Sequence, residues 1–85
     1  MSAPEAAPFY VQGRFDGAFK RSCNRSAIGV SLELVSAAYP TGLALLVLAH
    51  EIVCSDSYEA ESFAAEALAR ECVQLYTKIF LASSA

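Results

Sequence analysis

Two acidic residues have surroundings that could present a carboxylate to a metal ion. Asp16 follows an apolar stretch that begins at Phe9, and Gly17 comes directly after it, so the acid stands where a strand meets a turn. Glu61 stands early in a segment with helical spacing. Carboxylates that converge from separate elements can hold two divalent cations about 3.5–4 Å apart, as in metal-assisted phosphodiester hydrolysis. The plainer interpretation is that Asp16 starts a turn and Glu61 is a first-turn acid favoured by the helix dipole.

Basic residues gather around the same predicted turn. Four of the six in the chain are Arg14, Lys20, Arg21 and Arg25. They are suited to contact nucleic-acid phosphates, although a solvated hairpin loop explains them equally well. The net charge of −3 argues against a general nucleic-acid binder, which needs an excess of Lys and Arg. The only histidine, His50, has no other ligand-type residue beside it except Glu51, and we expect it at the surface.

Alternating side chains predict two strands in the first half of the chain. The first runs from Phe9 to Phe15 and places Asp16 on its more polar face, and the second runs from Ala27 to Val35. The twelve residues between Phe15 and Ile28 are then an arginine-rich hairpin loop. The segment 43–53 contains Leu and Ala, which favour a helix, and Val and Ile, which favour a strand, and we prefer the strand.

A helix is predicted next. Ser55, Asp56 and Ser57 are candidate N-caps, and Glu59 or Glu61 can complete the capping interaction. Apolar residues then recur at spacings of three and four and form one face that can cover a sheet. They are Ala60, Phe63, Ala64, Ala67, Leu68, Cys72 and Leu75.

In their order and spacing these motifs resemble the first half of a ribonuclease H-like domain of the reverse-transcriptase-associated type. The matching positions are Asp16, Gly17 and Ala18 on the first strand, Lys20 after it, Gly29 in the second strand, and Glu61, Ala64 and Ala67 on the helix. The last residues, KIFLASSA, resemble the fourth strand of that family. The turn of the family is replaced here by Arg21, Ser22, Cys23 and Asn24.

The resemblance implies an α/β fold over residues 9–85, preceded by a disordered lead over residues 1–8. Three antiparallel strands are followed by one helix and by a fourth strand parallel to the first, reached through a right-handed crossover. The domain is expected to be partial, because the sequence stops before the last strand and the later helices of the family.

The resemblance also implies cleavage of RNA in RNA–DNA hybrids, with Mg²⁺ or Mn²⁺ as cofactor. Asp16 and Glu61 take the catalytic and metal-binding roles, and Arg14, Lys20, Arg21 and Arg25 contact the hybrid or a structured RNA. Ser84 stands where the family has a second metal-binding Asp. Since a hydroxyl is a poor Mg²⁺ ligand, we expect weak metal binding and no activity from the isolated chain.

Composition limits these interpretations further. Eighty-five residues with 55% hydrophobic and 18% charged side chains predict one small folded domain. Three cysteines without CxxC spacing indicate free thiols in a reducing, intracellular compartment. The longest apolar run, Leu43–Ala49, is too short to span a bilayer, and the N-terminus does not have the pattern of a secretory signal.

Three alternatives remain open at this point. A non-enzymatic module could use its apolar helix or a sheet edge to bind proteins. An open edge at the fourth strand could lead to self-association or to completion by another polypeptide. A helical hairpin over residues 43–75 could instead dimerise, in which case Asp16 is only a turn residue.

Overall fold

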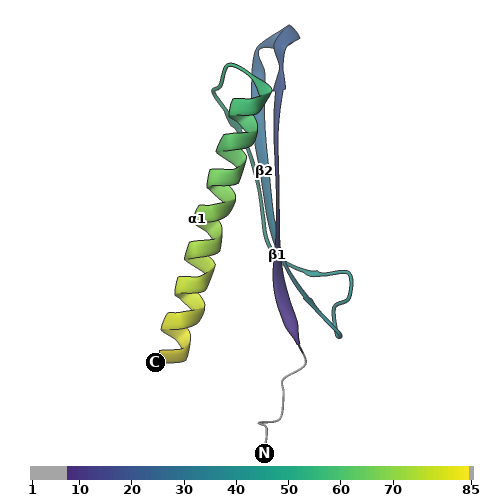
Figure 1. The fold of residues 1–85 in the computed structure, drawn as a ribbon, viewed down its shortest axis with the longest axis vertical. Coiled ribbons are helices and arrows are strands. Elements are labelled where there is room, and N and C mark those ends of the chain that lie inside the picture. The colour runs from purple at the N-terminus through teal and green to yellow at the C-terminus, as the bar shows by residue number, and fades with distance from the viewer. Residues whose placement is uncertain (1–7, 85) are drawn as a thin grey trace, which may run out of the picture.

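A computed structural model describes residues 8–84 of the protein. In chain order its elements are β1 (Phe9–Lys20), the short 3₁₀ helix η1 (Arg21–Cys23), β2 (Arg25–Ser36), β3 (Leu43–Ile52) and α1 (Ser57–Ser84) (Figure 1). The lead predicted over residues 1–8 lies outside the described residues except for Pro8, and so does Ala85.

The three strands form one antiparallel sheet in the order β1-β2-β3. Strand β1 pairs with β2 along its whole length, from Phe9 opposite Ser36 to Lys20 opposite Arg25. Strand β3 pairs with the other edge of β2, with an irregularity in register between Leu32 and Glu33. Within the described part of the chain, β1 and β3 are therefore the two edge strands.

The predicted arginine-rich loop between the first two strands is wrong. Residues 16–20 and 25–27 of this predicted loop belong to paired strands and continue the ladder. Only η1 and Asn24 connect β1 to β2. Asn24 adopts a left-handed conformation with φ of 52°, which Asn tolerates better than most residues, and its N–H donates to the Arg21 carbonyl. The longer ladder pairs backbone groups that a loop would leave to water. Asp16 consequently lies within β1 and not at its end.

The ambiguous segment 43–53 forms strand β3, so the helical hairpin over residues 43–75 is wrong. Side-chain alternation of β3 matches that of β2, because Val30 lies opposite Leu48 and Leu32 opposite Leu46. Partners that lie opposite one another share a face of the sheet, and this face carries the buried residues of β2.

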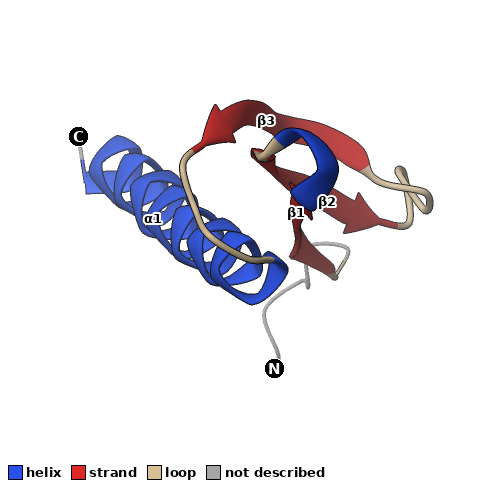
Figure 2. Cartoon of the chain, turned by 90° about the horizontal axis from the view of Figure 1, so that it is seen from above, coloured by secondary structure: helices blue, strands red, loops and turns tan. Residues whose placement is uncertain are grey.

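Helix α1 covers one face of the sheet, as the view along the strands shows (Figure 2). Its contacts are mainly with β1 and β2. The core between the two layers consists of small and medium-sized side chains, namely Ile28, Val30, Leu32, Ala60, Ala64 and Ala67. No large side chain among the described residues is fully buried. Because alanine side chains are small, α1 lies close to the sheet, and little apolar volume is buried between the two layers.

The predicted fourth strand, parallel to the first, is wrong. Residues 78–81 belong to α1, which continues for 28 residues to Ser84. The run Ile79-Phe80-Leu81 favours a strand in isolation, but no Gly or Pro interrupts the chain after Ser57. A helix that is already formed gains one hydrogen bond for each added residue, whereas a new strand needs a break and a partner. The described residues thus form three antiparallel strands followed by one helix.

Candidate metal site and basic hairpin

Asp16 lies near the middle of β1, opposite Gly29 of β2. Its side chain is exposed. Gly17 faces α1, and neighbouring residues of a strand point to opposite faces, so Asp16 projects from the uncovered face of the sheet. Among the described residues Asp16 makes no ion pair. Its carboxylate is therefore available to an external ligand.

The first turns of α1 rest directly on β1 beside Asp16. A methyl group added at Gly17 would lie 2.3 Å from the carbonyl carbon and oxygen of Ala60 and 2.5 Å from the amide nitrogen of Glu61. The backbones of Gly17 and Glu61 are thus in contact although they are far apart in the sequence. The side chain of Glu61 is exposed and extends from α1, on one side of β1. The side chain of Asp16 extends from the opposite face of β1.

The capping group of α1 is Asp56, one of the three candidates. Its Oδ1 accepts a hydrogen bond of 2.7 Å from the amide of Glu59. The hydroxyl of Ser55 donates to the carboxylate of Glu59 at 2.8 Å. These contacts satisfy a helix N–H that has no partner within the helix, and they engage Glu59 and Asp56 in capping. Asp16 and Glu61, on either side of this part of β1, form no ion pair or capping contact among the described residues.

Ser84 is the last residue of α1. It lies 23 residues beyond Glu61, which corresponds to roughly 35 Å along a helix at about 1.5 Å per residue. The doubtful third position of the predicted metal site is therefore at the far end of α1. More generally, within residues 8–84 no three His, Cys, Asp or Glu side chains are grouped so as to hold a metal ion.

The four predicted nucleic-acid contacts separate into two groups. Arg14 lies six residues before Lys20 on β1, and its Nε is 3.2 Å from Oε1 of Glu33 on the neighbouring strand. Lys20 and Arg25 are cross-strand partners beside η1, which contains Arg21. Three of the basic residues thus surround the end of the hairpin, and Arg14 stands about 20 Å from them along the strand at about 3.4 Å per residue.

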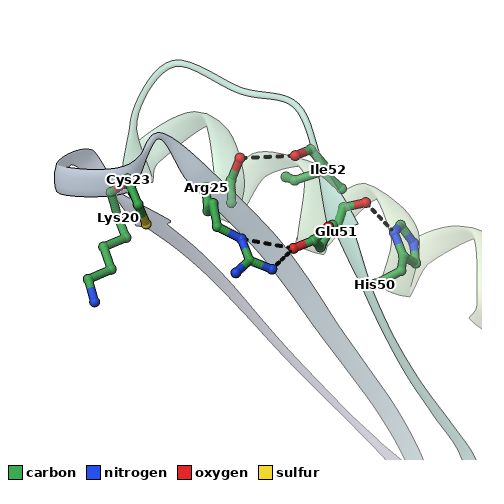
Figure 3. A network of polar contacts seen from close by, with 7 residues as sticks. Lys20, Cys23, Arg25, His50, Glu51 and Ile52 are labelled. Carbon is green, nitrogen blue, oxygen red and sulfur yellow. Dashed lines mark hydrogen bonds and ion pairs between the residues drawn. The ribbon is translucent and has the colours of Figure 1, made fainter.

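An ion pair joins the hairpin to β3, as the close view shows (Figure 3). The Nε of Arg25 donates to Oε1 of Glu51 at 3.1 Å, and Nη2 of Arg25 contacts the same oxygen. The hydrogen bond, reinforced by the opposite charge, lowers the pKa of Glu51 and raises the pKa of Arg25. Both side chains are exposed, so the pair is screened by solvent. Arg25 is engaged by Glu51, whereas Lys20 and Arg21 at the tip form no ion pair with the described residues.

Two further hydrogen bonds lie at the same end of the sheet. The hydroxyl of Ser26 donates to the carbonyl of Ile52 at 3.1 Å. The Nδ1 of His50 donates to the carbonyl oxygen of Glu51 at 3.1 Å, and the histidine is exposed, as expected (Figure 3). Cys23, the last residue of η1, is also exposed, and Cys23, Cys54 and Cys72 are all free thiols.

An apolar groove lies at the other end of the molecule, between β1 and the C-terminal half of α1. Its volume is about 530 Å³. The lining residues are Phe9, Val11, Gly13, Leu32, Cys72, Leu75, Tyr76 and Ile79. Sequence reasoning did not find this groove. The spacing that predicted one apolar helix face gave no indication that the face extends beyond the core it covers.

The ion pairs of Arg14 and Arg25 were also missed. Each joins residues on neighbouring strands, and only the pairing register brings them together.

Within residues 8–84, no helix combines the length and the apolar character that crossing a membrane requires. No protein-family model matches the chain, and neither a curated protein nor a solved structure matches it.

Proposed function

We propose that this chain is a ribonuclease H-like nucleic-acid domain in which Asp16 and Glu61 together hold a divalent cation, Mg²⁺ or Mn²⁺. The observation that carries the proposal is the backbone contact between Gly17 and Glu61. It brings a strand and a helix together at the two acids that the resemblance marks. Both acids are exposed, and neither forms an ion pair among the described residues.

The donor chemistry of these residues suits a hard cation. Mg²⁺ prefers oxygen ligands, keeps several of its waters and is commonly held by only one or two carboxylates. Because β1 is an edge strand, no other described strand covers its outer edge, and a cation shared by Asp16 and Glu61 would have to lie there. A single cation bound there would neutralise two carboxylates that otherwise repel one another.

Binding without cleavage is the expected behaviour of the isolated chain. In a two-metal site one cation activates water and the other stabilises the leaving oxygen, which takes several converging carboxylates. Asp16 and Glu61 are two such groups, and Ser84 stands at the distant end of α1. The role we assign to this chain is therefore recognition of an RNA–DNA hybrid with the help of a metal ion.

Lys20 and Arg21 are the residues we assign to phosphate contact. They lie at the end of the β1–β2 hairpin, which extends beyond the start of α1 (Figure 1). Neither forms an ion pair among the described residues, whereas Arg14 and Arg25 are engaged with glutamates. Recognition of a hybrid depends mainly on its shape and on phosphate and 2′-hydroxyl contacts, so a short basic hairpin is suited to it.

Fluorescence anisotropy with a labelled RNA–DNA hybrid tests the metal dependence of this function. We expect Mg²⁺ to strengthen binding to the wild type and to have little effect on Asp16→Asn. Asp56→Asn is the matched control, because it removes the same charge from a cap that Asn can also provide. Hybrid binding that does not respond to Mg²⁺ in the wild type would contradict the proposal.

The basic hairpin has its own test in the same assay. Replacing Lys20 and Arg21 together with Ala should weaken binding and make the plot of log affinity against log salt shallower, by about 1 for each phosphate that the variant no longer neutralises. Replacing Arg70 and Lys78, exposed positions on α1, together with Ala removes the same number of basic charges away from the hairpin and should leave the slope unchanged. Equal effects in both variants would mean that only net charge matters.

A non-enzymatic protein-interaction module is the second candidate. The apolar groove beside edge strand β1 favours it, because an extended peptide with alternating apolar residues could add to β1 and place those residues in the groove. Tyr76→Glu, at a groove position that is 77% exposed, should abolish binding of such a peptide without affecting the Mg²⁺ response. This candidate would be favoured if the chain bound the peptide and ignored both Mg²⁺ and the hybrid.

A further inference from the structure

Strand β3 has an outer edge that no other described element covers. The sheet ends at β3, and α1 has its main contacts with β1 and β2 (Figure 2). The segment Leu43–Ala49 contains no charged residue and consists of Leu, Val and Ala. Several of its side chains are exposed, and Val47 reaches 75%. A long, apolar, unpaired edge is a template for another strand, and natural proteins usually protect such edges with charge, Pro or a covering element.

The other edge of the sheet leaves little room for a second copy of this chain. Contacts of Gly13 with Leu68 and of Gly17 with Ala60 place α1 over β1. Since α1 lies over β1 and part of β2, pairing β1 with the β1 of a second copy would set two such helices side by side, between about one and two strand spacings apart, or about 5–10 Å. Packed helices need about 8–10 Å between their axes. At β3 this conflict is absent, because pairing there separates the two β1 strands by five strand spacings, or about 24 Å.

We infer that β3 is a homodimer interface, in which the β3 strands of two copies pair antiparallel and form one six-stranded sheet. The inference does not depend on the proposed function, since Asp16 and Glu61 lie outside the paired strands. It fits closed two-fold symmetry, in which the same residues meet on both sides and neither copy leaves a β3 edge unpaired.

The register follows from side-chain direction and charge. Because opposite residues must share a face, an antiparallel pair around Val47 sets Val47 against itself on the uncovered face and Leu46 against Leu48 of the second copy on the helix face. Centring the pair on Leu48 would instead set Leu46 against His50. We therefore place the two-fold axis at Val47.

Charge does not oppose this pairing, although the chain carries a net charge of −3. Glu51 is the only charged residue of β3, and Arg25 of the same chain engages it. In the Val47 register the two Glu51 residues stand eight residues apart along the paired strands, or about 27 Å at about 3.4 Å per residue. This separation exceeds the Debye length of about 8 Å at physiological salt.

Sedimentation equilibrium of the full chain over a wide concentration range tests the interface. The wild type should reach twice its mass of 9.1 kDa, and Val47→Lys should remain at the mass of one chain because it places two ammonium groups opposite one another. Val53→Lys is the matched control: it makes the same substitution at a 94% exposed position just after β3, and it should dimerise like the wild type.

A cross-link tests the register and remains informative if Val47→Lys disturbs folding. In a background with Cys23, Cys54 and Cys72 replaced by Ser, oxidised Val47→Cys should form a disulfide-linked dimer and Val53→Cys should not. A single-chain mass at every concentration would overturn the inference. So would a mass that keeps rising beyond the dimer, which indicates open-ended pairing of unlike edges, or a dimer that forms equally in Val47→Lys.

Discussion

Gly17 has no side chain, and this allows the backbone of α1 to rest on β1. A methyl group there would meet the Ala60 backbone at 2.3 Å, well inside van der Waals contact, and backbone atoms cannot rotate away as a side chain can. The value of φ at Gly17 is not in the left-handed region, so the requirement for Gly comes from space and not from backbone conformation. The same contact sets Glu61 beside the residue that follows Asp16.

Gly17→Ala should therefore destabilise the fold by about 1–3 kcal/mol, as expected for overpacking at a close contact. Gly29→Ala on β2 is the matched control, since its added methyl group would meet only the Leu48 carbonyl oxygen at 4.0 Å. The free energy of unfolding from urea denaturation compares the two variants. Equal stability of both would show that α1 does not lie as close to β1 as described.

The ion pair of Arg25 and Glu51 predicts a pH dependence of definite sign. Its hydrogen bond lowers the pKa of Glu51 below the ordinary value of 4.5, so the contribution to stability is present above that value and is lost as the pH falls through the lowered pKa. We expect the melting temperature of Glu51→Gln to lie slightly below that of the wild type at neutral pH and to converge with it on acidification. Glu66→Gln, at an exposed position on α1, should not show this convergence. A gap that widens toward low pH would contradict the assignment.

Among the elements, α1 depends most on local sequence, because its start is capped and its body carries the alanine stripe. Asp56 accepts the Glu59 amide, and Ser55 engages the Glu59 carboxylate. The cap fixes where the helix begins, and the position of the first turn decides whether Glu61 stands beside Gly17. The cap therefore affects the proposed metal site, because it determines where Glu61 lies relative to β1.

Removing the cap should reduce stability without removing a proposed metal ligand. Asp56→Ala is expected to cost about 1 kcal/mol, and Asp56→Asn much less, because Asn also accepts the N–H of the first turn. Chemical denaturation followed by circular dichroism measures both variants. A cost as large for Asn as for Ala would show that the negative charge, and not the cap hydrogen bond, stabilises the helix.

Local pattern predicted part of the arrangement of elements. Side-chain alternation predicted the parts of β1 and β2 that lie away from the turn. Helical spacing predicted the buried alanines of α1. The hairpin loop was predicted too long, because the cross-strand pairing that extends β1 to Lys20 and begins β2 at Arg25 is a non-local property. The fourth strand was wrong for a related reason, since the β preference of residues 79–81 is weaker than the continuation of a 28-residue helix.

The candidate site was predicted only as separate residues. The sequence shows Asp16 and Glu61 as acids on two elements, but their proximity depends on how α1 packs over Gly17. It shows four basic residues near one another in the chain, whereas strand pairing assigns Arg14 and Arg25 to glutamates and leaves Lys20 and Arg21 at the tip. Such assignments follow from register, which local pattern does not determine.

At the scale of the whole molecule, the described chain buries few large side chains and leaves two apolar regions exposed. The core consists of three aliphatic residues of β2 and three alanines of α1. The groove beside the Phe9–Gly13 part of β1 and the outer edge of β3 lie on different parts of the sheet, and neither Asp16 nor Glu61 lines the groove. A peptide or a second copy could therefore bind without occupying Asp16 or Glu61.

The most direct test of the central claim is a Mg²⁺ titration of the ¹⁵N-labelled chain followed by NMR, with Asp16→Asn and Asp56→Asn in parallel. We predict saturable shifts of the amide signals of Gly17, Ala60 and Glu61 in the wild type and in Asp56→Asn, and no such shifts in Asp16→Asn. No saturable shift at these amides in the wild type, or identical shifts in Asp16→Asn, would contradict a metal site formed by Asp16 and Glu61.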